Sequence, residues 1–275
     1  MIFQLHQPAF PLNRFVEHLV YFDGTSATHR LDRFLPDGNT ELIIDLNENP
    51  QYIYHNQNLH EIQTCRRAWV SGVRTQPITI PSGRESRMLI VAFKRGMAFP
   101  FYPFPMNELM DTVVDADGVF GTELHVLREQ LLASRAIERM FRLVEAFLIR
   151  RAGEGIDDST PTRGMQYALQ GIIRNPGRDC LQRLSEQVGY SQKHFIDLFR
   201  QQVGVSPKQY MRVMRFQKTL RIIEASPCVH WSQLAAQSGY YDQAHLIHEF
   251  KFFSGFTPNE YVSRKSALLN YIPVG

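Results

Sequence analysis

A repeated segment near the C-terminus constrains the fold of this chain more than any other feature. The residues Leu184-Ser-Glu-Gln-Val-Gly-Tyr190 match Leu234-Ala-Ala-Gln-Ser-Gly-Tyr240 at an offset of 50 (234 − 184 = 50). The later matches have an offset of 51 (250 − 199 = 51), so the second copy has one extra residue after its Gly-Tyr pair. In these later matches, Phe199-Arg200, Gly204, Ser206-Pro207 and Tyr210 of the first copy correspond to Phe250-Lys251, Gly255, Thr257-Pro258 and Tyr261 of the second. Such a repeat indicates one supersecondary unit built twice.

Each copy has the pattern of two short helices joined by a tight turn. In the first copy, Leu184 and Val188 face inward on a helix that ends at Gly189, which accepts the left-handed backbone that the turn requires. Ser191 and Asp242 are the predicted caps of the second helices. The predicted buried positions of these second helices are Phe195, Leu198 and Phe199 in one copy, and Leu246 and Phe250 in the other. A helix, a turn and a second helix form the arrangement that reads DNA in the major groove.

A long helix is predicted between the two copies, from Pro207 to about Ala225. Ser206-Pro207-Lys208-Gln209 supplies a cap, a proline in the first turn and a glutamine that closes a capping box, and Thr257-Pro258-Asn259-Glu260 repeats this signal in the second copy. The long helix would join the two units rigidly. Two recognition helices on such a rod would enter successive major grooves, about 34 Å apart, on one face of a duplex.

Charge is distributed unevenly along the chain. Residues 1–159 contain 16 Lys and Arg against 20 Asp and Glu (16 − 20 = −4), whereas residues 160–275 contain 14 against 7 (14 − 7 = +7). Only the second part therefore has the charge expected of a polyanion binder.

The segment from about Arg178 to Lys265 resembles the DNA-binding domain of AraC/XylS-type transcription regulators. The resemblance rests on the second copy, Gly239-Tyr240 to Tyr261, preceded by a first copy at the right distance. It implies an all-α domain of two helix-turn-helix units that binds promoter DNA in a sequence-specific way, as an activator or repressor. The segments 34–38 and 71–75 are similar to a β-rich sensor type of the same family. That similarity implies a small-molecule effector or protein partner, with RNA polymerase and a second copy of the chain as further partners.

The resemblance and the exposed positions of each second helix together predict the residues that touch DNA. Positions matching Lys193, Ile196 and Asp197 face base edges in the family; Asp197 would accept a hydrogen bond from cytosine or hold a neighbouring basic residue. The base-reading set is Gln192, Lys193, Ile196, Asp197, Gln243, Ala244, Ile247 and His248. The phosphate set is Arg200, Lys208, Arg212, Arg215, Lys218 and Lys251, with Arg264 and Lys265 near a helix end.

Several of these positions have alternative interpretations. His248 is either a DNA contact or a solvated imidazole, and His194 and His245 are predicted to be structural. The basic residues together would otherwise form a solvated face, and Arg215 would otherwise pair with an acid inside the domain.

The chain is predicted to be α+β, with a β-rich domain over 1–155, a linker over 156–163 and the helical domain over 164–275. At 275 residues it exceeds the usual length of one domain, and the linker is rich in Gly, Asp, Ser, Thr and Pro. The clearest strand candidates are Thr40–Leu46, after the turn signal Pro36-Asp-Gly-Asn39, and Ala68–Val73, Ile78–Ile80 and Met88–Phe93. A sandwich or small barrel with flanking helices is the natural closure for such short strands.

Two apolar helical stripes lie at the end of the first domain. The first is Leu124, Leu127 and Leu131, and the second is Ile137, Met140, Phe141, Val144, Phe147 and Leu148. Either they cover the β domain or they form a dimer interface. Among the predicted strands, four polar or aromatic residues are candidates for an effector pocket: Asp37, Glu41, Trp69 and Arg74.

The sequence shows no catalytic motif, so we expect a regulator that is not an enzyme and that needs no cofactor or metal. The six histidines before residue 126 lack close metal-ligand spacing. The alternative is a metal-binding, cupin-like enzyme or a sugar-binding module fused to the DNA-binding domain. Cys65, Cys180 and Cys228 fit neither a disulfide framework nor a metal knuckle, and Cys65 is a candidate redox sensor. No apolar run reaches the ~20 residues of a membrane span, and the first residues lack a signal peptide, so we expect a cytoplasmic protein without membrane contact.

Overall fold

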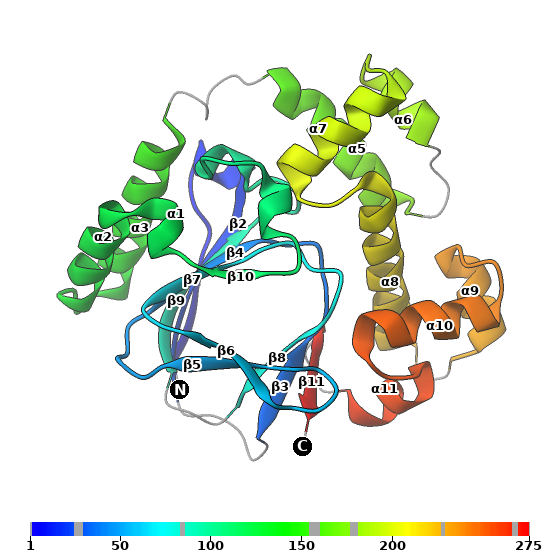
Figure 1. Cartoon of the computed structure of the whole chain (residues 1–275), viewed down its shortest axis with the longest axis horizontal. Helices are drawn as coiled ribbons and strands as arrows, with labels where there is room; N and C mark the ends of the chain where they lie inside the picture. Colours follow the sequence, from blue (N-terminus) through cyan, green and yellow to red (C-terminus); the bar gives the residue numbers. More distant parts are fainter. Residues whose placement is uncertain are drawn as a thin grey trace.

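The chain folds into a β-rich part followed by a helical part, in a computed structural model that describes residues 2–24, 30–82, 86–153, 160–176, 181–226, 229–265 and 269–274. Figure 1 shows the strands on one side of the long helix α8 (Pro207–Ala225) and the last helices on the other. The predicted α+β class with a β-rich domain before a helical domain is confirmed.

Two antiparallel sheets form the β-rich part. The first has the strand order β1 (Ile2–His6), β2 (Val16–Gly24), β9 (Ser86–Phe93), β4 (Glu41–Asp45), β7 (Ala68–Ser71) and β10 (Val113–Asp115). The second has the order β11 (Tyr271–Val274), β3 (Leu31–Phe34), β8 (Ile78–Pro81), β5 (Gln51–Tyr54) and β6 (Glu61–Cys65). The sheets do not close on one another, so of the two predicted closures the structure shows an open sandwich.

Alternation along the strands gives the first sheet two different faces. In β4, Leu42 and Ile44 are fully buried in the main core, whereas Glu41 and Ile43 point into a cavity between the sheets. The main core also contains the apolar stripes of α2 (Thr122–Leu132) and α3 (Ile137–Ala152). These stripes are therefore buried within the chain, which confirms the covering interpretation and leaves them no free face for a second copy.

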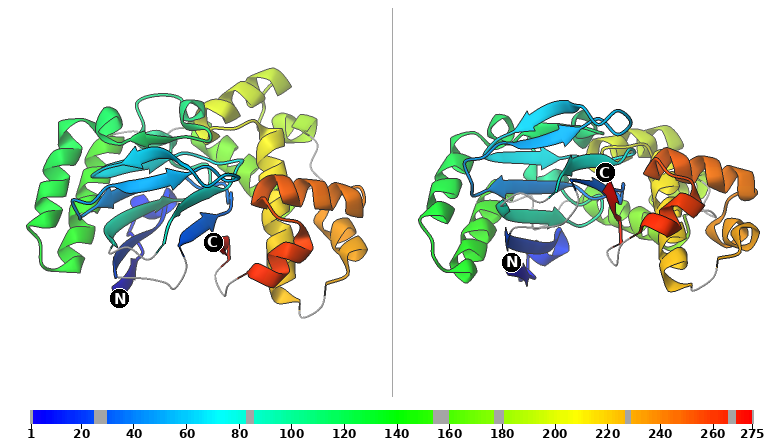
Figure 2. Two further views of the ribbon diagram at one scale, coloured as in Figure 1. Left: turned by 60° about the horizontal axis from the view of Figure 1, so that its bottom comes forward. Right: turned by 90° about the horizontal axis from the view of Figure 1, so that it is seen from below.

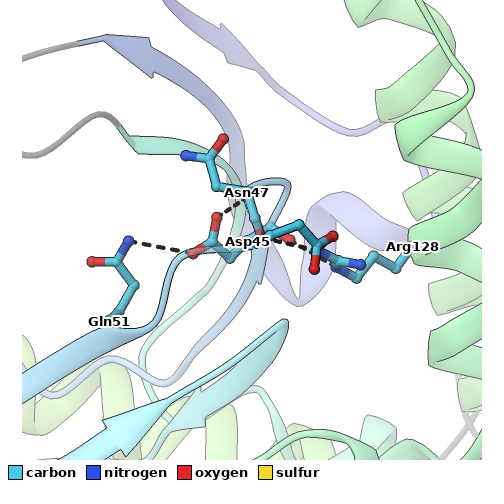
Figure 3. A network of polar contacts seen from close by, with 5 residues as sticks. Asp45, Asn47, Gln51 and Arg128 are labelled. Carbon is cyan, nitrogen blue, oxygen red and sulfur yellow. Dashed lines mark hydrogen bonds and ion pairs between the residues drawn. The ribbon is translucent and has the colours of Figure 1, made fainter.

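A polar network joins α2 to the turn after β4, as Figure 3 shows. Arg128 is buried, and its guanidinium donates to the carbonyl oxygens of Asp45 and Asn47 at 2.8 and 3.0 Å and pairs with Glu48 at 3.2 Å. The Asp45 carboxylate accepts hydrogen bonds from the Asn47 amide and from the Gln51 side chain. The turn that leads from β4 in the first sheet to β5 in the second is thus fixed to α2, which covers the first sheet.

The helical part consists of the repeated units and the helices that support them. These are α5 (Thr160–Arg174), α6 (Leu181–Gln187), α7 (Gln192–Val203), α8, α9 (Trp231–Ser238), α10 (Gln243–Ser254) and α11 (Pro258–Arg264). The predicted long helix is confirmed at both ends. Both predicted capping boxes are present. The side chains of Ser206 and Thr257 each accept a hydrogen bond from the backbone amide three residues later, and their own backbone amides donate to the side-chain oxygen of Gln209 or Glu260.

The two parts are closely joined. Gly204, at the end of α7, lies so close to the short helix η3 (Met106–Leu109) that an added Cβ would be 3.0 Å from the Met106 carbonyl oxygen. Strand β11 pairs with β3, so residues 271–274 return to the β-rich part although the predicted helical domain included them. Of the predicted linker, residues 156–159 lie outside the described residues, and α5 begins at Thr160.

Candidate nucleic-acid interface and internal cavity

The two helix-turn-helix units have the same turn. In each copy the tyrosine amide, of Tyr190 or Tyr240, donates to the carbonyl five residues earlier at 2.9 Å. The preceding glycines have φ of +75° at Gly189 and +84° at Gly239, a left-handed backbone in which a side chain would be strained. This pair of features ends a helix abruptly and turns the chain into the next one. The repeat predicted from sequence is therefore confirmed as a repeated geometry.

The second helices of both units begin in the same way. The side chains of Ser191 and Asp242 cap α7 and α10 by accepting hydrogen bonds from the amides of His194 and His245, as predicted. Each of these histidines meets the tyrosine of its own turn edge to face, with ring centroids 4.8 and 5.3 Å apart. Both imidazoles are thus part of the turn, in agreement with their predicted structural role.

The predicted base-reading residues lie in the N-terminal halves of α7 and α10. On α7, Gln192, Lys193 and Asp197 are exposed and Ile196 is half-buried. On α10 the exposed members are Gln243, Ala244, Ile247 and His248. Both sets are therefore open to an incoming duplex, and the β-rich part covers neither.

The predicted phosphate contacts divide into exposed and engaged side chains. Arg200, Lys208 and Lys251 are exposed, and Lys218 is half-buried. Arg212 and Arg215, both on α8, are engaged with aromatic rings. Near the end of α11, Lys265 pairs with Glu224 at 2.8 Å and Arg264 lies over the ring of Phe256.

Arg212 holds α10 against α8. Its guanidinium makes two hydrogen bonds to the buried Glu249, at 2.7 and 2.9 Å, and lies over the rings of Phe252 and Phe253. An internal acidic partner was the alternative interpretation for Arg215, but its guanidinium lies over the ring of Tyr240. The internal ion pair is therefore formed by Arg212, three residues before Arg215 on the same helix.

A cavity of about 310 Å³ lies between the two sheets. Its walls include all four residues that sequence singled out as pocket candidates, Asp37, Glu41, Trp69 and Arg74. Most of the remaining wall is apolar and comes from both sheets, for example Ile43, Ile53, Ile78, Ile80, Met88 and Ile90. Such a space, mainly apolar with a few convergent polar groups, has the character of a small-molecule site.

The two carboxylates of the cavity differ in their hydrogen bonding. The Asp37 carboxylate accepts hydrogen bonds from the amide and side chain of Asn39, at 2.9 and 2.7 Å. The Glu41 carboxylate has no hydrogen bond or ion pair with any described residue. Burial, reinforced by the charge of Asp37 and opposed by Arg74, raises the pKa of Glu41 to about 7.

The wall of the cavity also contacts the helix that joins the two DNA-reading units. The amide of Gln217, buried on α8, donates to the Pro36 carbonyl at 2.8 Å and to the side chain of Asn270 at 2.7 Å. Asn270 lines the cavity. Gly38, with φ +84°, packs so closely on Met214 that an added Cβ would be 2.7 Å from its Cε. Sequence reasoning missed this link because these residues are far apart along the chain.

The described residues give little support to a redox-sensing cysteine or a metal-binding enzyme. Cys65 is buried, and burial raises the pKa of its thiol to about 11, which opposes the reactive thiolate of a redox sensor; Cys180 and Cys228 lie outside the described residues. Within the described ranges there is no cluster of three or more His, Cys, Asp or Glu that could hold a metal ion. In the same ranges, no helix combines the length and apolar character that crossing a membrane requires.

Comparisons with known proteins agree with the two-part organisation. Residues 184–264 match a family described as a helix-turn-helix domain, and residues 4–115 match a domain of unknown function, DUF6597. An uncharacterized HTH-type transcriptional regulator of Haemophilus influenzae is 28% identical over 117 residues, which cover 42% of this chain and 38% of the relative. The uncharacterized HTH-type regulator YbfI of Bacillus subtilis is 34% identical over 129 residues, which cover 45% and 46%.

The matched region thus spans less than half of each of these relatives. Among solved structures, ToxT from Vibrio cholerae has a TM-score of 0.47 and 10% identity over 89% of this chain and 98% of that one. The family match coincides with the repeated turns, caps and capping boxes described above. Residues 184–264 therefore belong to the AraC-type helix-turn-helix family.

Proposed function

We propose that the chain is a transcription regulator that binds duplex DNA by placing α7 and α10 in successive major grooves. The observation that carries this proposal is the repeated unit itself, which presents two exposed reading helices on one rigid rod. The excess positive charge of residues 160–275 supports it, because neutralising phosphates supplies much of the affinity for DNA.

The proposed roles follow from exposure. The base-reading set predicted above contacts base edges, with Lys193 suited to guanine and Gln243 to adenine. Arg200, Lys208 and Lys251 contact phosphates because they are exposed near these helices. Arg212 acts mainly through Glu249, by holding α10 in place.

The internal cavity is the proposed effector site. A ligand there would touch the residues around Pro36 and Asn270, which also hold α8 through Gln217. Occupancy would thereby change the position of the rod and the affinity for DNA. The proposal includes RNA polymerase and a second copy of the chain as partners, no catalytic activity, and a cytoplasmic location, because the chromosome of a bacterium lies there.

DNA binding is tested by fluorescence anisotropy and by selection of bound sequences from a random duplex library. We expect enrichment of one motif by the full chain, with affinity that falls steeply as salt rises. Lys193→Ala and Gln243→Ala should relax the preference at base pairs about one helical turn apart. Arg66→Ala, an exposed site in the β-rich part, is the control. Binding that is absent, or that has no sequence preference, would reject the proposal.

A further inference from the structure

We propose that the ligand of the internal cavity is a compact zwitterion, with an ammonium and a carboxylate group on an apolar body, as in an α-amino acid with an apolar side chain. The regulatory consequence of this proposal rests on the proposed function. The binding itself is a property of the β-rich part and is measured without DNA.

The register of the first sheet places opposite charges side by side in the cavity wall. Glu41 on β4 lies directly opposite Ser71 on β7. The Ser71 hydroxyl accepts a hydrogen bond from Nε of Arg74 at 3.2 Å. The carboxylate and the guanidinium are therefore near neighbours, yet no ion pair within 4.0 Å joins them.

Asp111 and Glu41 act on Arg74 through their charge, but neither Glu41 nor Arg74 has an ion-pair partner within 4.0 Å among the described residues. Within the described part of the chain, the Glu41 carboxylate accepts no hydrogen bond, and the terminal nitrogens of Arg74 donate none. Charged groups removed from water are costly unless they are paired and hydrogen-bonded. Because both side chains line the cavity, the missing partners are groups of a ligand.

The combination of signs excludes simpler ligands. A plain cation would satisfy Glu41 but would be placed beside the guanidinium of Arg74, which repels it. A plain anion would form the bidentate contact that Arg74 offers but, at a pH above about 7, would face the ionised carboxylate of Glu41. Asp37 already receives two hydrogen bonds from Asn39, so Glu41 is the acceptor for the ammonium group. Only a molecule with both charges matches both groups.

The rest of the cavity determines the body of the ligand. Beyond the charged end, Ile43, Trp69, Ile78 and Met88 supply mostly apolar walls. The volume of about 310 Å³ lies at the lower limit for small-molecule pockets, which restricts the ligand to a compact molecule. An amino acid with an aliphatic or aromatic side chain meets both conditions.

The test is isothermal titration calorimetry on the full chain with L-leucine, L-methionine, L-phenylalanine and L-tryptophan as probes. For the tightest probe, the amine without the carboxylate and the acid without the amine are then measured; for leucine these are 3-methylbutylamine and 4-methylpentanoate. We expect at least one probe to bind and each analogue to bind about 10-fold more weakly or worse. This comparison needs no variant protein.

Two variants test which side chain binds which charged group of the ligand. Glu41→Gln and Arg74→Gln should each weaken binding of the zwitterion by about 10- to 100-fold. Glu41→Gln should spare the acid analogue, and Arg74→Gln should spare the amine. Glu129→Gln and Arg66→Gln change exposed residues and are the matched controls.

The inference is overturned if none of the four probes binds, if either analogue binds as tightly as the zwitterion, or if the variants bind like the controls. DNA binding, measured by anisotropy without ligand, separates the two proposals. Intact DNA binding with no amino-acid binding rejects this inference alone, whereas loss of DNA binding rejects the proposed function.

Discussion

The unpaired carboxylate of Glu41 should make the β-rich part less stable as pH rises. Its pKa is raised from 4.5 to about 7 in the folded chain, so the folded state holds a proton that the unfolded state has released. The stabilisation is complete below pH 4.5 and is lost as pH rises through about 7. A displacement of this size corresponds to about 3 kcal/mol of unfolding free energy.

Glu41→Gln isolates this effect, because glutamine has nearly the shape of a protonated glutamate and does not ionise. The variant and the unmodified chain should have nearly equal unfolding free energies at pH 4.5. By pH 8 the variant should be more stable by about 3 kcal/mol, since only the unmodified chain then has an ionised carboxyl group in the cavity wall without an ion-pair partner.

Urea unfolding from pH 4.5 to 8 measures this difference. Trp69 lines the cavity, so its fluorescence reports on the β-rich part once Trp231→Phe has removed the other tryptophan in the described chain. Glu129→Gln, on the exposed side of α2, is the control and should follow the unmodified chain at every pH. Parallel profiles for Glu41→Gln and the unmodified chain would show that the Glu41 carboxyl group does not cause the loss of stability at high pH.

Three further variants test the packing around the two sites. Arg212→Met should destabilise the chain by about 3 kcal/mol, because it leaves Glu249 charged and buried, and Glu249→Leu should restore much of the loss in thermal unfolding. Gly72→Ala should cost about 3 kcal/mol in urea unfolding, since the new Cβ would be 1.8 Å from the Leu109 carbonyl oxygen; normal stability would contradict this packing. Gln217→Met should cost about 2 kcal/mol and reduce the effect of a bound ligand on DNA affinity, and unchanged coupling in anisotropy would argue against this route.

The helical part could be predicted closely because its signals are local. A cap, a proline in the first turn and a closing glutamine lie within four residues at Ser206, and they determine where α8 begins. Gly189 and Gly239 determine where the first helix of each unit ends. Each of these signals acts within one turn of helix and needs no knowledge of the rest of the fold.

The β-rich part was predicted only in outline because sheets depend on distant partners. The strands β4, β7, β8 and β9 have continuous or alternating apolar patterns and were found. Strand β11 was missed because its only signal is its pairing with β3, more than 230 residues earlier in the chain. Pairing across such a separation leaves no periodic trace in the sequence.

In the candidate sites, too, the features set by local sequence could be predicted and those set by distant partners could not. The reading faces of α7 and α10 follow from helical periodicity, and the four pocket candidates follow from polar or aromatic residues among apolar strands. The internal partner of Glu249 could not be assigned, because Arg212 and Arg215 differ by less than one turn and only packing decides between them. The unpaired state of Glu41 also depends on side chains from other strands.

Hydroxyl-radical footprinting of the full chain on its selected DNA sequence tests whether α7 and α10 enter successive major grooves. We expect two protected windows about one helical turn apart on the same face of the duplex. Lys193→Ala should weaken one window and Gln243→Ala the other. A single protected window, or two windows on opposite faces, would contradict two reading helices held on one rod.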